Sequence, residues 1–268
     1  MLATMCTRLT VLASGSKGNC AIVASARTRL LVDAGLSCRE TLRRMAAAGE
    51  DPHSLTAILI SHEHSDHITG LAVLARKLKV PVYMTGATND MWGRQCGVKQ
   101  THLDRLELFC SGHSFQIDDI QVTPFTIPHD AVDPVAFAFR VDGVKLAIVT
   151  DLGYMPASVR DHIRDSDLLM VESNHDLEML RIGRYPWSVK QRVMSRVGHL
   201  SNAALAEFLA SDYDGSAAVV VLAHLSEENN HPEIARDTAE RALAPRRSLL
   251  QNRLMLASQW QPLEAIHL

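Results

Sequence analysis

Residues 61–67 read Ser61-His62-Glu63-His64-Ser65-Asp66-His67 and follow directly after an apolar, strand-like run. His62 and His64 stand two residues apart, so on an extended loop their side chains point the same way. Asp66 and His67 come where the chain turns into a helix-like stretch. A single metal ion cannot comfortably take all four side chains from so short a segment, so the spacing favours two ions. Imidazole and carboxylate ligands suit zinc, manganese or iron.

Other polar residues also stand directly after apolar runs of strand length: Asp33, Asp151, Glu172 and His224. In layered α/β folds, ligands gather beyond the carboxyl ends of the strands. We therefore expect these side chains to share one rim with His62.

Strand-like runs alternate with helix-like stretches along the chain. Helices are expected from Ser37, where Glu40 completes a capping box, and after Gly70, Ser201 and Pro232. Strands are expected at 8–13, 20–24, 29–32, 57–60, 82–85, within 106–139, and at 144–150, 168–171, 217–223 and 254–260. The simplest account is one α/β domain spanning residues 1–268, with two mixed sheets.

Composition excludes several classes of protein. The 268 residues are 47% hydrophobic and carry a net charge of −3, which excludes global disorder and a uniformly basic surface. No apolar window of about 18 residues predicts a membrane span. The N-terminus does not read as an export signal, so we expect a cytoplasmic protein. The five cysteines lack CxxC spacing, whereas the 13 histidines cluster with aspartates, as metal ligands do.

Taken together, these segments resemble the metallo-β-lactamase superfamily. Its five motifs occur in order, as Leu31-Val32-Asp33-Ala34-Gly35, the 61–67 stretch, Ile127-Pro128-His129-Asp130, Val149-Thr150-Asp151-Leu152-Gly153 and Leu222-Ala223-His224-Leu225-Ser226. The resemblance implies an αββα sandwich, in which helices flank two mixed β-sheets.

The resemblance also implies roles for these residues. One divalent ion would be held by His62, His64 and His129, and the other by Asp66, His67 and His224. Asp151 would bridge the ions, and Asp33 would orient residues 61–67, called here the histidine loop. His113 is a rival to His129. The ions, zinc or manganese rather than iron, would generate a hydroxide that attacks phosphorus, with Asp66 and Asp151 part of the catalytic machinery.

Further segments resemble the YycJ/WalJ-like (VicX) branch of exonuclease-type proteins in this superfamily. They are Leu12–Cys20, Val171–Asp176, Arg184–Ser188, Gly198–Asn202 and Leu222–Asn230. This resemblance implies phosphodiester hydrolysis on DNA, from a 5′ end of a duplex. His199 then becomes a candidate phosphate ligand or proton donor, with His175 as the alternative, and Ser201 lies in the same motif.

Two segments are candidates for substrate binding. The Gly/Ser turn containing Ser14, Ser16 and Asn19 offers N–H and hydroxyl groups to an anion, although it also fits an ordinary hairpin. Residues 181–200 hold five basic and no acidic residues, with Tyr185 and Trp187 interleaved. Cations such as Arg184 and Arg192 beside aromatic rings suit nucleic acid, whereas a solvated basic face is the alternative.

Chain length excludes one group of relatives. Only 72 residues separate Asp151 from His224, too few for the inserted cap domain of β-CASP nucleases. The alternative function is a small-molecule hydrolase of the same fold, such as a glyoxalase II-like thioesterase or a cyclic phosphodiesterase. A binding protein that kept the metals without turnover is a third reading, and the complete ligand set argues against it.

Overall fold

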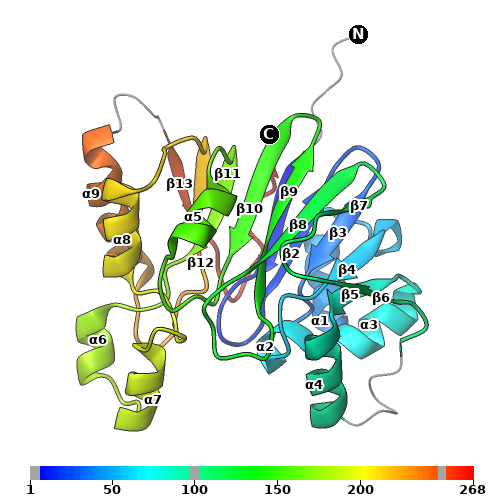
Figure 1. Ribbon diagram of the computed structural model, residues 1–268, viewed down its shortest axis with the longest axis horizontal. Coiled ribbons are helices and arrows are strands. Elements are labelled where there is room, and N and C mark those ends of the chain that lie inside the picture. The colour runs from blue at the N-terminus through cyan, green and yellow to red at the C-terminus, as the bar shows by residue number, and fades with distance from the viewer. Residues whose placement is uncertain (1–6, 97–102, 247–251) are drawn as a thin grey trace.

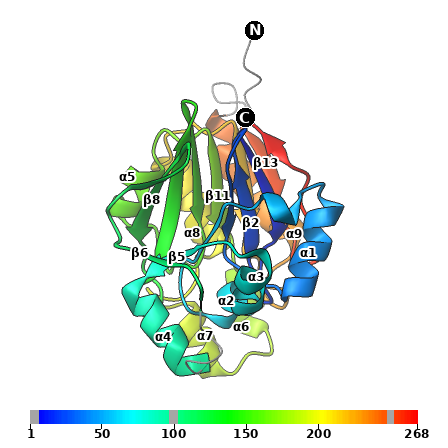
Figure 2. The ribbon, with the colours of Figure 1, turned by 90° about the vertical axis from the view of Figure 1, so that its right-hand side faces the viewer.

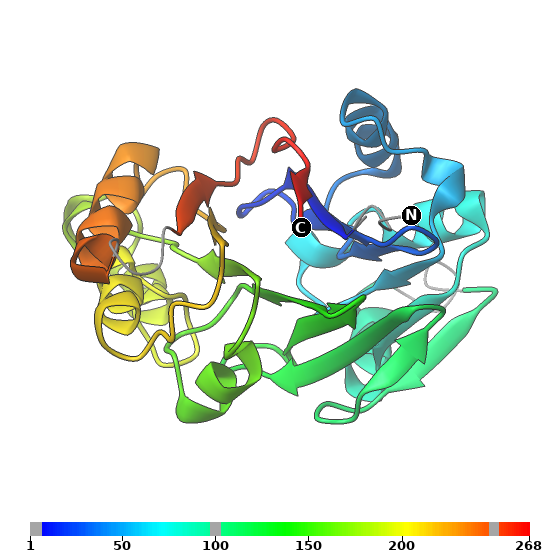
Figure 3. The same cartoon turned by 90° about the horizontal axis from the view of Figure 1, so that it is seen from above.

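The computed structural model describes residues 7–96, 103–246 and 252–268. Two seven-stranded β-sheets face each other, and helices cover the outer face of each (Figures 1 and 3). The αββα sandwich implied by the resemblance is therefore confirmed. Within the described chain, no helix combines the length and the apolar character needed to cross a membrane.

The first sheet has the strand order β14-β1-β2-β3-β4-β5-β6. Neighbouring strands are antiparallel from β14 to β3 and parallel from β3 to β6. Its strands are β1 (Arg8–Ala13), β2 (Cys20–Ala24), β3 (Arg29–Val32), β4 (Ala57–Leu59), β5 (Val82–Thr85), β6 (Leu106–Phe109) and β14 (Ile266–His267). The helices between them are α1 (Cys38–Ala47), the 3-10 helix η1 (Pro52–Ser54), α2 (Ser65–Ile68), α3 (Leu71–Leu78) and α4 (Gly86–Cys96).

The second sheet has the order β13-β12-β11-β10-β9-β8-β7. It is antiparallel from β7 to β10 and parallel from β10 to β13. Its strands are β7 (Phe115–Ile117), β8 (Ile120–Thr126), β9 (Val135–Val141), β10 (Val144–Val149), β11 (Leu168–Glu172), β12 (Val219–Ala223) and β13 (Arg253–Leu256). The helices are α5 (Ala157–Ile163), α6 (Leu177–Ile182), α7 (Trp187–Val193), α8 (Asn202–Ser211), α9 (Pro232–Leu243) and the 3-10 helix η2 (Ala244–Arg246).

Strand β9 shows how the core is divided. Phe137 and Phe139 pack between the two sheets, whereas Ala136 and Ala138 pack in the layer between the second sheet and its helices. Side chains alternate between the faces of a strand, and here both faces are buried. The strands therefore read as continuous apolar runs in the sequence, as expected for sheets covered on both sides.

The prediction of a last strand over 254–260 was wrong in its extent. Strand β13 ends at Leu256, and the chain then leaves the sheet. The Ser258 carbonyl accepts a hydrogen bond from Ser14 N at 3.1 Å, and the Gln259 side chain bonds to Lys17 N at 2.8 Å. These residues serve the 14–18 turn instead of the sheet, and the apolar pattern alone does not show this.

One end of the sandwich collects the strand ends that the sequence singled out. Strands β10, β11 and β12 are parallel, so their carboxyl ends meet at one edge. Helices α2, α6 and α7 lie at this end, away from the C-terminus (Figures 1 and 2). This is where the predicted rim forms.

Candidate metal centre

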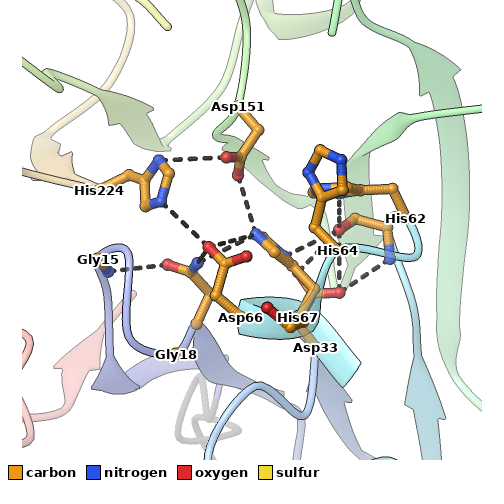
Figure 4. Close-up of polar contacts among 12 residues, drawn as sticks. Gly15, Gly18, Asp33, His62, His64, Asp66, His67, Asp151 and His224 are labelled. Carbon is orange, nitrogen blue, oxygen red and sulfur yellow. Dashed lines mark hydrogen bonds and ion pairs between the residues drawn. The ribbon is translucent and has the colours of Figure 1, made fainter. Parts of the chain in front are cut away.

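The seven predicted metal ligands converge in two groups. The first is His62, His64 and His129, and the second is Asp66, His67, Asp151 and His224. Within each group, one potential ligand atom per residue lies within 4.8 Å of all the others. Figure 4 shows how the labelled members of these groups, His62, His64, Asp66, His67, Asp151 and His224, lie close to one another.

Asp151 lies between the two groups. Its Oδ1 atom is 3.9 Å from His129 Nε2 and 3.2 Å from His224 Nδ1, and its Oδ2 atom is 3.2 Å from His67 Nε2. Oδ1 thus lies between His129 of the first group and His224 of the second, and Oδ2 faces His67 of the second group, so the carboxylate lies where the predicted bridging ligand would be.

Three of these strand-end residues have left-handed backbone conformations: Asp33 has φ 60°, Asp151 φ 61° and His224 φ 53°. L-residues rarely adopt this region, and such strain tends to cluster at functional sites. At all three positions it occurs just where the chain leaves the strand and the side chain joins the centre.

In the first group, the His62 and His129 rings are held by contacts of the nitrogen that faces away from the group. His64 Nδ1 lies 3.2 Å from both His62 Nε2 and His129 Nε2. His62 Nδ1 lies 2.9 Å from Ser61 Oγ, and His129 Nδ1 lies 3.1 Å from the Gly198 carbonyl. Burial lowers the pKa of His62 and of His129, which favours the neutral imidazole that binds a cation.

In the second group, the His67 ring is held by Asp33, which lies at the position predicted for it. Asp33 Oδ2 is 2.8 Å from His67 Nδ1, and Asp33 Oδ1 accepts a hydrogen bond from Ser61 N at 2.8 Å. A glycine is required at position 35 because the histidine loop lies against its backbone. A Cβ there would come within 1.6 Å of the Asp66 carbonyl oxygen. Asp33 therefore orients the His67 ring, and Gly35 allows the backbone at Asp66 to come close.

Glu172 is a buried carboxylate to which the sequence analysis assigned no role. Its Oε1 atom accepts hydrogen bonds from His224 Nδ1 at 2.7 Å and from His199 Nδ1 at 2.9 Å. Its Oε2 atom accepts from Leu152 N and Leu200 N, each at 2.9 Å. Burial would raise the pKa of Glu172, but the two imidazoles outweigh it and lower the pKa to about 2. In the sequence, the indication that Glu172 belongs to this centre was its position at the end of an apolar run.

The residues present fit two divalent ions. His224 Nε2 and Asp151 Oδ2 are buried and make no hydrogen bond, although Asp151 Oδ2 contacts His67. Burial would lower the pKa values of His67 and His224, but the surrounding carboxylates, Asp33 and Asp151 foremost, raise both well above the ordinary range. The second group therefore attracts positive charge. Imidazole nitrogens with carboxylate oxygens are donors that zinc and manganese accept.

A cavity of about 360 Å³ opens onto this centre. Several of the predicted substrate-binding residues line it: Ser16, Tyr185, Arg192 and His199. The histidine alternative, His175, also lines it, and burial lowers the pKa of His175 to about 4. His113 instead lies exposed on the turn between β6 and β7, so the structure groups His129 with the histidine loop.

Ser14, Asn19 and Ser201 contact protein groups rather than the cavity. Ser14 Oγ accepts a hydrogen bond from His224 N at 2.8 Å. Asn19 Nδ2 lies 3.0 Å from His67 Nε2 and 3.3 Å from Asp66 Oδ2. Ser201 Oγ caps helix α8 by accepting from Ala204 N at 3.1 Å. Contact of these three residues with substrate stays a prediction.

The basic segment has local partners for most of its charges. Arg181 pairs with Glu178, the Lys190 ammonium donates to the Arg181 carbonyl, Arg192 pairs with Asp130, and Arg196 lies over the Tyr154 ring. Arg184 and Trp187 are exposed and lie outside the residues that line the cavity. The segment still packs against the centre, since a Cβ on Gly153 would come within 2.3 Å of the Arg196 backbone.

Comparisons with known proteins agree with this geometry. Residues 28–225 match the family model described as a β-lactamase superfamily domain. The chain is 42% identical over 233 residues to exodeoxyribonuclease YycJ of Bacillus anthracis, covering 87% of this chain and 88% of the relative. It is 37% identical over 237 residues to exodeoxyribonuclease WalJ of Streptococcus pneumoniae serotype 2 (strain D39), covering 88% of each. The solved structure of Zn²⁺-bound PqqB from Methylobacterium extorquens shares the fold, with a TM-score of 0.69, 17% identity, and coverage of 96% of this chain and 99% of that one.

Proposed function

Because this chain belongs to the metallo-β-lactamase superfamily, we propose that it is a metal-dependent exodeoxyribonuclease, which hydrolyses phosphodiester bonds of duplex DNA from the 5′ end. The observation that carries the proposal is the pair of ligand groups that meet at Asp151, beside a cavity lined by His199 and Tyr185. The similarity to two exodeoxyribonucleases over most of the chain supports DNA as the substrate.

The first ion would be held by His62, His64 and His129, and the second by Asp66, His67 and His224, with Asp151 shared. Two divalent ions, when bound, lower the pKa of a coordinated water and neutralise charge on the phosphate. Asp33 and Glu172 hold His67 and His224 through their Nδ1 atoms, so that the Nε2 atoms face the centre.

We assign proton donation to His199. Its Nδ1 atom is held by Glu172, which leaves Nε2 as the atom free to act, and its side chain is 18% exposed. A proton placed on the leaving oxygen makes that oxygen a better leaving group. His175 is the weaker candidate because it is buried and its pKa is lowered to about 4, so it is neutral near pH 7.

The cavity wall supplied by α7 and the chain before it would contact the nucleotide. Tyr185 offers an aromatic face, and the exposed Arg192 guanidinium lies close enough to the cavity to pair with a phosphate. Arg184 and Trp187 lie farther out, where they would meet DNA beyond the bond being cut.

A small-molecule hydrolase is the second candidate, favoured by the cavity volume of about 360 Å³ and by the local pairing of most basic residues in 181–200. Salt separates the two functions. Release of nucleotides from duplex DNA should fall steeply between low and physiological salt, because phosphate contacts release counterions. Hydrolysis of a small chromogenic phosphodiester should hardly change. DNA left intact while a small ester or thioester is cleaved would replace our proposal with the second function.

A further inference from the structure

Asn229 has an unusual side chain. In the described residues, six buried side-chain nitrogen or oxygen atoms lack a hydrogen-bond partner, and Asn229 contributes two of them, Oδ1 and Nδ2. Two others, Asp151 Oδ2 and His224 Nε2, belong to the metal centre, where a ligand is expected. Leaving a buried donor or acceptor unpaired is costly, so each such atom in a native fold needs an explanation.

The neighbouring Asn230 shows that the fold can satisfy an amide at this place. Asn230 Nδ2 donates to Ser173 O at 2.9 Å and to Asn174 O at 3.0 Å, and Asn230 Oδ1 accepts from Asn202 Nδ2 at 2.8 Å. Both asparagines are buried, at 1% exposure for Asn229 and 6% for Asn230. The protein therefore satisfies the hydrogen-bonding groups of the Asn230 amide, whereas it leaves those of the adjacent Asn229 amide without a partner.

Asn229 also lies at the active cavity. It lines the same cavity as Asp151, His199 and Tyr185. Its backbone is fixed on both sides, since Asn229 N donates to Ser226 Oγ at 3.2 Å and Asn229 O accepts from Asp176 N at 2.9 Å. The position of the amide is thus set by the fold, whereas its hydrogen-bonding groups are left free.

The link between α6 and α7 covers this amide. A Cβ on Gly183 would lie 2.4 Å from Asn229 Oδ1, so only glycine allows the link to pass so closely. Tyr185 follows two residues later and reaches the cavity. Because Asn229 is 1% exposed, a ligand in this cavity could reach its amide only if the segment that carries Gly183 and Tyr185 moved aside.

We propose that Asn229 and Tyr185 form a subsite for the nucleoside next to the bond being cut, an inference that rests on the proposed nuclease function. An aromatic ring can stack on any base. An asparagine amide presents one donor group and one acceptor in a plane, which is the pattern that matches a base edge. The subsite thereby distinguishes a nucleotide substrate from a phosphodiester that has no nucleoside.

The test compares two chromogenic substrates, thymidine 5′-(p-nitrophenyl phosphate) and bis(p-nitrophenyl) phosphate, in the metal-loaded wild-type protein and in Asn229→Leu. The readout is the ratio of kcat/KM for the nucleoside ester to kcat/KM for the ester without a nucleoside. Loss of the amide's hydrogen bonds should lower this ratio about tenfold. The Tm should stay level or rise, because leucine has no polar atoms to leave unpaired.

Asn230→Leu is the matched control. It should lower the Tm and reduce turnover of both esters together, because it breaks hydrogen bonds that the fold uses. Asn229→Asp keeps the side-chain shape, removes the donor and should also lower the ratio. An unchanged ratio in both Asn229 variants would overturn the subsite, and so would a fall in Tm for Asn229→Leu as large as that for Asn230→Leu. Failure of the nuclease proposal is seen separately, as duplex DNA left intact by the wild-type protein.

Discussion

Glu172 and His199 are joined by a hydrogen bond of 2.9 Å between Oε1 and Nδ1. The same oxygen accepts a hydrogen bond from His224 Nδ1 at 2.7 Å. One buried carboxylate therefore orients both a predicted metal ligand and the predicted proton donor, and it also holds the backbone beside Asp151 through Leu152 N. We infer from this arrangement that Glu172 positions His224 and His199.

Glu172→Gln should reduce turnover by about 10- to 100-fold, the usual effect of removing a group that orients a metal ligand. The amide has the shape of the carboxylate, but its NH₂ group cannot accept a hydrogen bond, so at least one donor loses its partner. Metal content measured alongside kcat should show that the second ion binds more weakly. Glu178→Gln, which alters an exposed pair with Arg181, is the control. Wild-type turnover and metal content in Glu172→Gln would contradict this role.

His199→Ala should slow the chemical step by about 10²- to 10⁴-fold, the range for loss of a general acid. The bound metal should stay at two ions per chain, since His199 is not among the predicted ligands. A p-nitrophenyl ester should lose much less, because p-nitrophenolate leaves without a proton. Single-turnover rates on DNA and on the ester measure the difference. Loss of metal from His199→Ala would make His199 a ligand instead.

Metal binding should raise the Tm, and more so at pH 7.5 than at pH 5.5. In the absence of metal, nearby carboxylates outweigh burial and raise the pKa values of His67 and His224, so bound protons compete with the ions as the pH falls. Thermal melts with added Mn²⁺ or with chelator measure the effect. His113→Ala should give the same shift as wild type. A shift independent of pH would mean that these histidines are not ligands.

Glu50 provides a prediction away from the centre. It bonds to Arg8 at 2.7 Å and to Thr10 Oγ1 at 2.9 Å. Burial would raise its pKa, but Arg8, Thr10 and Arg29 outweigh burial, and the folded-state pKa lies below the ordinary value. Glu50 therefore stabilises the fold at pH values above its unfolded pKa, and this stabilisation is lost as the pH falls through the folded pKa.

Glu50→Gln should accordingly lower the free energy of unfolding by about 1–3 kcal/mol at pH 7, as expected for hydrogen bonds to a charged group. The difference from wild type should shrink in the acid range below about pH 4.5. Urea titrations at several pH values measure it, with the exposed Glu207→Gln as control. A difference that is constant with pH would refute the assigned cause.

The sequence predicted that the proposed ligands would lie together, because several of them stand at strand ends. Asp151 and His224 follow apolar runs that form β10 and β12, and parallel strands place their carboxyl ends at one edge. The role of Glu172 was harder to predict, since a polar residue after a strand usually begins a loop. Only the fold shows that its carboxylate meets two imidazoles and two backbone N–H groups.

The basic segment was predicted less well, because sequence shows charges and not their partners. Arg192 and Lys190 both read as free cations, yet Arg192 pairs with Asp130 and the Lys190 side chain is buried against the Arg181 carbonyl. Asn229 lies within the Leu222–Asn230 segment that carries the resemblance, but the sequence did not distinguish it from its neighbours. An asparagine in a polar loop is common, and only burial without partners sets it apart.

The central claim is that this chain cleaves DNA with two metal ions, and that Asp151 is a ligand of both. The most direct measurement is digestion of a 5′-labelled blunt duplex by the wild-type protein and by Asp151→Ala, with Mn²⁺, Zn²⁺ or chelator, beside single-stranded DNA and RNA of the same sequence. We predict mononucleotides from the duplex in the wild-type metal lanes, and none with chelator or with Asp151→Ala, which should also bind both ions more weakly. Near-normal digestion by Asp151→Ala, or intact DNA in every wild-type lane with two metals bound, would contradict the account.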